Sequence, residues 1–152
     1  MIDLDRKTER KRVLLIEDDV DFSDVLKNTF KSDIVSEIEI ASDPFEAIDM
    51  MTDKFYNFII LDWNLPAFNG GETLRKAGQA MATEPDLPSQ WDCQKVPVVV
   101  FSSAPKELCV PRKNKHFRYI GFVSKNQPFN QIVGLLNGYI EKSCSKKSFS
   151  SI

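Results

Sequence analysis

The chain lacks most of the residues and patterns that mark specialised protein classes. One histidine and three widely spaced cysteines, with no Cys-x-x-Cys pair, disfavour a zinc or dithiol redox site. No apolar run approaches the roughly 18 residues of a membrane span, and the charged amino terminus has no signal-peptide core. A net charge of -2 is not that of a strongly basic nucleic-acid binder. We therefore expect a cytoplasmic protein with reduced cysteines and without membrane or nucleic-acid partners.

The length of 152 residues fits one domain, and a composition that is 42% hydrophobic and 28% charged is typical of a globular protein. The highly charged residues 1–11 are predicted to form a flexible lead-in, and the Ser- and Lys-rich residues 142–152 a flexible tail. Residues 12–141 then make up the domain itself.

Four apolar runs of strand length occur at residues 13–16, 58–61, 96–101 and 119–123. Residues 38–41 alternate apolar and polar side chains, which is typical of a strand with one wetter side. Helical patterns separate these five segments. The alternation of strands and helices predicts a doubly wound α/β fold with a parallel sheet, in which three strands are central and two are edges.

Polar caps mark where the helices should begin. Asp21 is expected to cap the first helix, and Asp43, with Pro44 after it, is expected to start the second. Phe45 should face the core from that second helix. A third helix is predicted over residues 72–81, after a loop that contains two glycines.

Two segments do not fit a regular helix. The helix after the fourth strand should be short or irregular, because Pro111 breaks any helix that starts at Pro105. Residues 83–95 form an inserted loop that should project from the edge of the sheet opposite Asp62. The single histidine, His116, lies in a basic stretch and is expected at the surface.

Chemically distinctive side chains follow the strands at their carboxyl ends, where open parallel sheets bind ligands: Glu17, Asp18, Asp62, Ser102 and Lys125. We prefer Ser102 to Ser103 as the hydroxyl of this group because it directly follows the apolar run. Clustered carboxylates stay ionised together when a cation compensates them, and a set of oxygen ligands suits Mg²⁺ or Mn²⁺. A carboxylate such as Asp62 is then able to attack a phosphoryl group.

These residues and the LDWNLP segment, residues 61–66, resemble the response-regulator receiver domains of two-component signalling, especially the single-domain chemotaxis receivers. The resemblance covers about residues 11–140. It implies a flavodoxin-like fold with strand order 2-1-3-4-5 and helices on both faces. By position it implies that Asp62 is the phosphoacceptor and a metal ligand, and that Asp18, Glu17 and the Asn64 backbone carbonyl are the further metal ligands. It also implies that Ser102 is the switch hydroxyl, Lys125 the lysine that is invariant in the family, and Phe122 the aromatic switch residue.

The resemblance also implies how such a domain works. It would accept a phosphoryl group from a sensor histidine kinase or histidine phosphotransfer protein in a Mg²⁺-dependent reaction and signal to a downstream protein as a monomer or weak dimer. It would not be an enzyme beyond catalysing its own phosphotransfer and dephosphorylation. The chain departs from the family pattern where Asn126 replaces the usual proline after the lysine, at Pro111, and in the loop over residues 83–95.

Other interpretations remain open at this point. A receiver-like scaffold that works without phosphorylation would explain the altered segment around Pro111, although it has no need of a metal-ready cluster. A phosphohydrolase with Asp62 as nucleophile is disfavoured, because Asn64 stands where the second acid is expected. A nucleotide triphosphatase is disfavoured by the absence of a Gly-rich Lys-Ser/Thr loop. Phe122 fits ordinary core packing as well as a switch role.

Overall fold

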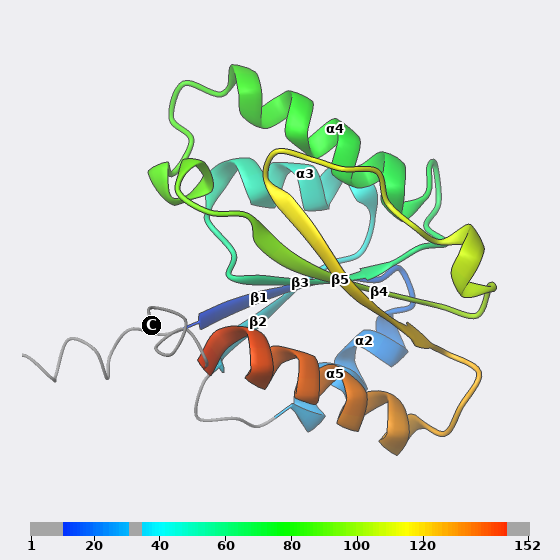
Figure 1. Cartoon of the computed structure of the whole chain (residues 1–152). Coiled ribbons are helices and arrows are strands. Elements are labelled where there is room, and N and C mark those ends of the chain that lie inside the picture. Colours follow the sequence, from blue (N-terminus) through cyan, green and yellow to red (C-terminus); the bar gives the residue numbers. More distant parts are fainter. Residues whose placement is uncertain (1–10, 31–34, 146–152) are drawn as a thin grey trace, which may run out of the picture.

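The computed structural model describes residues 11–30 and 35–145, so residues 1–10 of the expected lead-in and 146–152 of the expected tail lie outside it. Strands and helices alternate along the described chain (Figure 1). Their bounds are β1 Lys11–Ile16, α2 Val20–Thr29, β2 Val35–Ala41, α3 Pro44–Asp53, β3 Phe58–Asp62, α4 Gly70–Thr83, η1 Ser89–Asp92, β4 Val96–Ser102, η2 Lys106–Leu108, β5 Phe117–Ser124 and α5 Phe129–Ser145. Within these ranges no helix is both long enough and apolar enough to span a bilayer.

The five strands form one parallel sheet in the order β2-β1-β3-β4-β5. This order confirms the predicted fold class. It also confirms the division into central and edge strands, because β2, whose sequence alternates, lies at one edge, while the apolar strands β1, β3 and β4 lie inside. All five residues of β3 are buried, which explains why its sequence shows no alternation.

Helices cover both faces of the sheet, with α3 and α4 on one face and α2 and α5 on the other (Figure 1). Alternate residues of the central strands therefore belong to different cores. Leu14 packs in the cluster under α3 and α4, and Leu15 packs in the cluster under α2 and α5. Both residues are fully buried.

The predicted start of the second helix is confirmed, and that of the first shifts by two residues. The Asp43 side chain accepts a hydrogen bond from the Glu46 backbone N–H at 2.8 Å. In α2, Asp19 and not Asp21 is the cap, since its Oδ1 accepts from the Phe22 N–H at 3.0 Å. The expectation for Phe45 was wrong: its side chain is 61% exposed and packs edge-on against Phe68.

The segment between β4 and β5 contains only the short turn η2, which confirms the prediction of a short or irregular element there. Residues 109–116 continue without regular structure and pass alongside α4, coloured yellow-green to yellow in Figure 1. One contact that holds this segment is a hydrogen bond from the Asn114 side chain to the Leu74 carbonyl at 3.4 Å.

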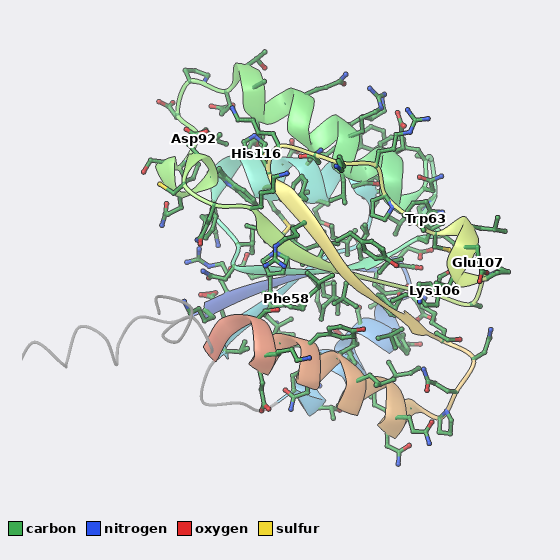
Figure 2. All side chains as sticks on the ribbon, viewed as in Figure 1. Phe58, Trp63, Asp92, Lys106, Glu107 and His116 are labelled. Atoms are coloured by element: carbon green, nitrogen blue, oxygen red, sulfur yellow. The ribbon has the colours of Figure 1, made fainter. Side chains whose placement is uncertain are left out.

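The insertion over residues 83–95 lies at the edge of the sheet opposite Asp62, as predicted, but it is packed and not free. Figure 2 shows Asp92 and His116 at one end of the molecule and Trp63 at the other. The Trp91 side chain is 1% exposed and donates to the Lys54 carbonyl at 3.2 Å. His116 is buried as well, with Nδ1 3.0 Å from the Trp91 carbonyl oxygen. The expectation of a surface histidine was therefore wrong.

Candidate functional site

Three carboxylates meet at the carboxyl ends of β1 and β3. These strands are neighbours in the sheet, so the Glu17-Asp18 pair that follows β1 lies beside Asp62 at the end of β3. One carboxylate oxygen from each of the three residues lies within 4.8 Å of the others. Glu17 and Asp62 are 1% and 2% exposed, whereas Asp18 is exposed to solvent. Solvent therefore reaches the carboxylate cluster at Asp18, while Glu17 and Asp62 are shielded from it.

Lys125 reaches this cluster from the end of β5. Its Nζ lies 2.8 Å from Glu17 Oε1 and 3.3 Å from Asp62 Oδ2. The ammonium also lies 4.7 Å from the centroid of the Phe101 ring and 5.3 Å from that of Phe22. These aromatic rings fix the path of the long side chain while its charge remains paired.

The replacement of the usual proline by Asn126 leaves Lys125 within reach of the acids. The Lys125 backbone N–H donates to the Ser102 carbonyl at 2.9 Å. The Asn126 side chain donates to the Ser103 carbonyl at 2.9 Å, and its backbone N–H donates to Ser124 Oγ at 2.9 Å. Hydrogen bonds therefore hold the end of β5 against the end of β4.

Ser102 lies in the site and Ser103 does not. The Ser102 side chain is fully buried, and its Oγ accepts hydrogen bonds from Asn64 Nδ2 at 3.1 Å and from the Ala104 N–H at 3.0 Å. Ser103 is exposed. The Asn64 backbone N–H also donates to Asp62 Oδ1 at 3.2 Å, so Asn64 links Ser102 to the carboxylate. The expected role of the Asn64 carbonyl as a metal ligand stays a prediction.

The surroundings of the cluster raise the pKa of both Asp62 and Lys125, but for different reasons. Burial and the neighbouring Glu17 charge together raise the pKa of Asp62 to about 7, against the opposing effect of the Lys125 charge. Burial alone would lower the pKa of Lys125, but its hydrogen bond to Glu17 and the Asp62 charge raise it overall. Near neutral pH a lysine charge therefore faces a carboxylate that is costly to ionise.

The donor set fits a small divalent cation. It offers carboxylate oxygens, one of them exposed, and none of the nitrogen or sulfur ligands that zinc and copper prefer. A divalent cation would also remove the electrostatic reason for the raised pKa of Asp62. Glu17, Asp18 and Asp62 are therefore the residues that could hold Mg²⁺ or Mn²⁺ in this chain.

The loop after Asp62 contains a positioning feature that the sequence patterns did not reveal. The Gly70 N–H donates to the Trp63 carbonyl at 2.8 Å. A Cβ placed on Gly70 would lie 2.9 Å from the Asp62 carbonyl oxygen, and one on Gly71 would lie 2.6 Å from the Trp63 ring. Gly70 is needed for α4 to start this close to β3, whereas Gly71 leaves room for the Trp63 ring. Gly70 and Gly71, which were predicted to lie in a loop, therefore belong to the first turn of α4.

Phe122 lies on β5, opposite Val100 of β4. Its side chain is partly buried and packs against the core cluster under α3 and α4. This position fits both interpretations of the sequence, and the switch role of Phe122 stays a prediction.

Comparisons with known proteins agree with this geometry. The model of the response regulator receiver domain family matches residues 13–137. No curated protein sequence matches the chain significantly. Similar solved structures include a CheY-like receiver domain protein from Methanospirillum hungatei JF-1, with 20% identity and a TM-score of 0.63 over 89% of this chain and 97% of that one.

Two further structures show the same fold at comparable sequence identity and TM-score. The phosphorylated cyanobacterial phytochrome response regulator RcpA has 22% identity and a TM-score of 0.66 over 90% of this chain and 96% of its own. The receiver domain of the hybrid histidine kinase CckA has 18% identity and a TM-score of 0.60 over 88% of this chain and 99% of its own.

Proposed function

We propose that this chain, which belongs to the response regulator receiver family of two-component signalling, accepts a phosphoryl group on Asp62 in a Mg²⁺-dependent reaction. The observation that carries the proposal is the position of the Asp62 carboxylate. It is buried at the end of β3, within 4.8 Å of the Glu17 and Asp18 carboxylates and 3.3 Å from the Lys125 ammonium. A merely structural aspartate has no need of so concentrated a group of charges.

In the proposed transfer, an Asp62 carboxylate oxygen forms a bond to phosphorus as the bond between phosphorus and the donor imidazole nitrogen breaks. The electron pair leaves with that nitrogen, and Asp62 becomes an acyl phosphate. Glu17, Asp18, Asp62 and the Asn64 carbonyl would hold Mg²⁺, which when bound neutralises the charge of the phosphoryl oxygens. Attack of water on the phosphorus later breaks its bond to the Asp62 oxygen, which restores the carboxylate and releases inorganic phosphate.

Lys125 and Ser102 complete the binding of the phosphoryl group. Lys125 already lies next to Asp62, so its ammonium can pair with a phosphoryl oxygen with little rearrangement. Ser102 Oγ accepts hydrogen bonds from Asn64 and Ala104. Among the described residues its hydroxyl hydrogen has no acceptor, so it is free to donate to a phosphoryl oxygen.

We propose a sensor histidine kinase or a histidine phosphotransfer protein as the phosphoryl donor, and a downstream protein as the target, with this chain a monomer or weak dimer. The phosphorylated form of RcpA and the presence of a receiver domain in the hybrid kinase CckA support a donor of this class. Residues 12–141 would form the functional domain. Signalling would pass from Ser102 through residues 105–116 and Phe122, because these lie where the family's fourth helix and fifth strand would change.

A scaffold that works without phosphorylation is the second candidate, and the single short turn between β4 and β5 favours it. An irregular segment in place of a helix would limit the repacking by which phosphorylation changes partner binding. The two candidates differ in one simple property. The scaffold has no need to bind Mg²⁺ or a phosphoryl group at the strand ends.

Trp63 fluorescence tests the proposed function directly. Trp63 follows Asp62, whereas the other tryptophan, Trp91, is buried against His116, which Figure 2 shows at the other end of the molecule, so Trp91 provides a constant background. We expect Mg²⁺ to change the emission and beryllofluoride, a phosphoryl mimic, to change it further. The response to the mimic should vanish in Asp62→Asn. If neither ligand binds at millimolar concentration by fluorescence or calorimetry, the scaffold function replaces this one.

A further inference from the structure

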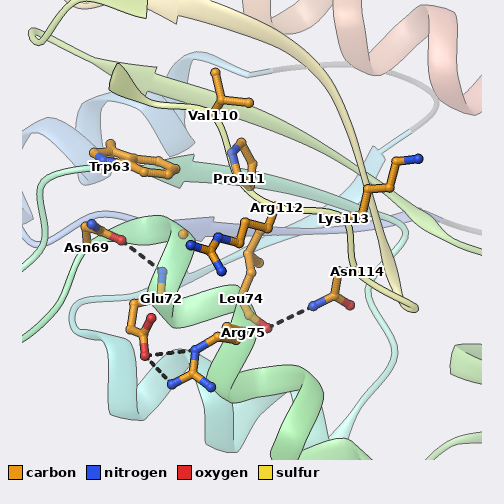
Figure 3. A pocket seen from close by; sticks show the side chains of 11 residues that line it. Trp63, Asn69, Glu72, Leu74, Arg75, Val110, Pro111, Arg112, Lys113 and Asn114 are labelled. Carbon is orange, nitrogen blue, oxygen red and sulfur yellow. Dashed lines mark hydrogen bonds and ion pairs between the residues drawn. The ribbon is translucent and has the colours of Figure 1, made fainter. Parts of the chain in front are cut away.

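A pocket lies between α4 and the irregular segment that follows η2, next to the candidate site but separate from its carboxylates (Figure 3). Its volume is about 290 Å³. Trp63, Leu74, Val110 and Pro111 supply an apolar lining, and the charged side chains around it are Glu72, Arg75, Arg112 and Lys113. The pocket exists because residues 109–116 run past α4 without forming a helix.

The charges around this pocket are unbalanced. Arg75 pairs with Glu72 of the same helix, so these two charges compensate each other. Within residues 11–30 and 35–145, Arg112 and Lys113 form no ion pair. Figure 3 shows the Arg112 guanidinium directed over the first turns of α4, and Lys113 on the other side of the pocket. The Arg112 charge acts on Glu72 at longer range. A ligand in the pocket would therefore meet two cations that form no close ion pair with the described residues.

The apolar part of the pocket is also open to a partner. The Val110 side chain is 53% exposed, and Trp63 and Leu74 reach the pocket from the core cluster. A pocket of about 290 Å³ with an apolar lining, flanked by the charges of Arg112 and Lys113, suits an apolar side chain with carboxylates beside it. A nucleic-acid backbone suits it less well, because two free cations provide little affinity and the net charge of the chain is -2.

We propose that this pocket is a docking site for an acidic peptide segment of a partner protein, in which an apolar side chain lies between carboxylates. The apolar side chain fills the space between Trp63, Leu74 and Pro111, and the carboxylates pair with Arg112 and Lys113. The proposal goes beyond phosphorylation of Asp62 and does not depend on it. Because Trp63 lines the pocket and follows Asp62 in sequence, occupancy of the pocket is expected to alter the emission of Trp63.

The proposal is tested by selecting ligands from a displayed library of random peptides of about 12 residues against the full chain. The best peptide is then labelled and its affinity measured by fluorescence anisotropy. We expect the selected sequences to be enriched in Asp and Glu around Leu, Ile, Phe or Trp. Enrichment of neutral or basic sequences would overturn the proposal, as would the absence of any enrichment.

Charge reversal locates the binding site. We expect Arg112→Glu with Lys113→Glu to weaken binding at least about tenfold, and Val110→Asp to weaken it as well. The matched control is Lys27→Glu with Lys142→Glu, which changes the net charge equally on the exposed ends of α2 and α5 and should change the affinity less than about twofold. All three proteins should remain folded in a urea titration, because the substituted side chains are exposed; the control pair should lose a little stability, because Lys27 and Lys142 lie in the last turns of α2 and α5.

Two outcomes would contradict docking at this pocket. Equal weakening in the control pair would mean that binding follows net charge alone. Competition by a single-stranded oligonucleotide as strong as that by unlabelled peptide would mean that the surface recognises anions in general. The change in Trp63 emission provides a separate readout, because it should be lost in Trp63→Phe while the labelled peptide still reports binding.

Discussion

Replacing Asp62 by Asn should stabilise the metal-free protein at pH 8. The substitution removes a carboxylate that is only 2% exposed and next to Glu17, while the amide oxygen can still accept from the Asn64 N–H. The difference between a pKa of about 7 and the ordinary value of 3.8 corresponds to about 4 kcal/mol at full ionisation. Solvent reaches the cluster beside Asp18 and screens part of this cost, so we expect a gain of about 2 kcal/mol.

The sign of the pH dependence follows from the direction of the pKa change. Burial and Glu17 raise the pKa of Asp62 in the folded state, so the folded protein holds this proton more tightly than the unfolded chain does. The associated stability is fully present below pH 3.8 and is lost as the pH rises through about 7. Asp62→Asn should therefore have little effect at pH 4 and its full effect at pH 8.

Urea unfolding in EDTA at pH 4, 6 and 8 measures this difference, with Asp49→Asn as a matched control on the exposed face of α3. Added Mg²⁺ should reverse the order at pH 8, since a cation that binds only the folded wild type stabilises it. If Asp62→Asn is no more stable than wild type at pH 8 in EDTA, ionisation of Asp62 does not lower the free energy of unfolding. The physical basis for expecting a cation there would then fail.

Four other substitutions test separate parts of the structure by urea unfolding or ligand binding. Ala67 has φ of 72°, so Ala67→Gly should raise the free energy of unfolding by roughly 0.5–1 kcal/mol. Gly70→Ala should lower it by about 1–3 kcal/mol, because the new Cβ meets the Asp62 carbonyl and Leu61. Trp91→Ala should lower it by about 3–5 kcal/mol, since it empties a buried site. Lys125→Met should keep Mg²⁺ binding by calorimetry but abolish the response of Trp63 to beryllofluoride.

The fold and the side chains at the strand ends follow from local sequence patterns. An apolar run such as residues 58–61 is long enough to form one buried strand, and in a parallel sheet the residue after it must lie at the carboxyl edge. Glu17, Asp62 and Lys125 could therefore be placed together before the structure was known. Their contacts depend on the order of the strands, which the family resemblance implied.

The errors come from features that depend on contacts far along the chain. His116 lies in a run of basic residues, but it is buried, and its ring nitrogen contacts the backbone carbonyl of Trp91, which lies 25 positions earlier in the chain. Phe45 has the spacing of a core residue, yet Ala47 and Met51 take the buried positions of α3. Gly70 resembles a loop residue, and only the close approach of α4 to β3 explains it.

The proposed chemistry and the proposed readout lie in different parts of this molecule. Asp62, Ser102 and Lys125 are fixed by the ends of three paired strands, and within the described part of the chain none of the contacts given above for them involves residues 105–116. The sheet can therefore keep the proposed phosphoryl site although the segment between β4 and β5 is irregular in this chain and not a helix. The irregular path of this segment opens the pocket lined by Trp63 and Arg112. Because Trp63 lines this pocket and directly follows Asp62, it would act together with Ser102, residues 105–116 and Phe122 in the proposed signalling from Asp62 to the new surface.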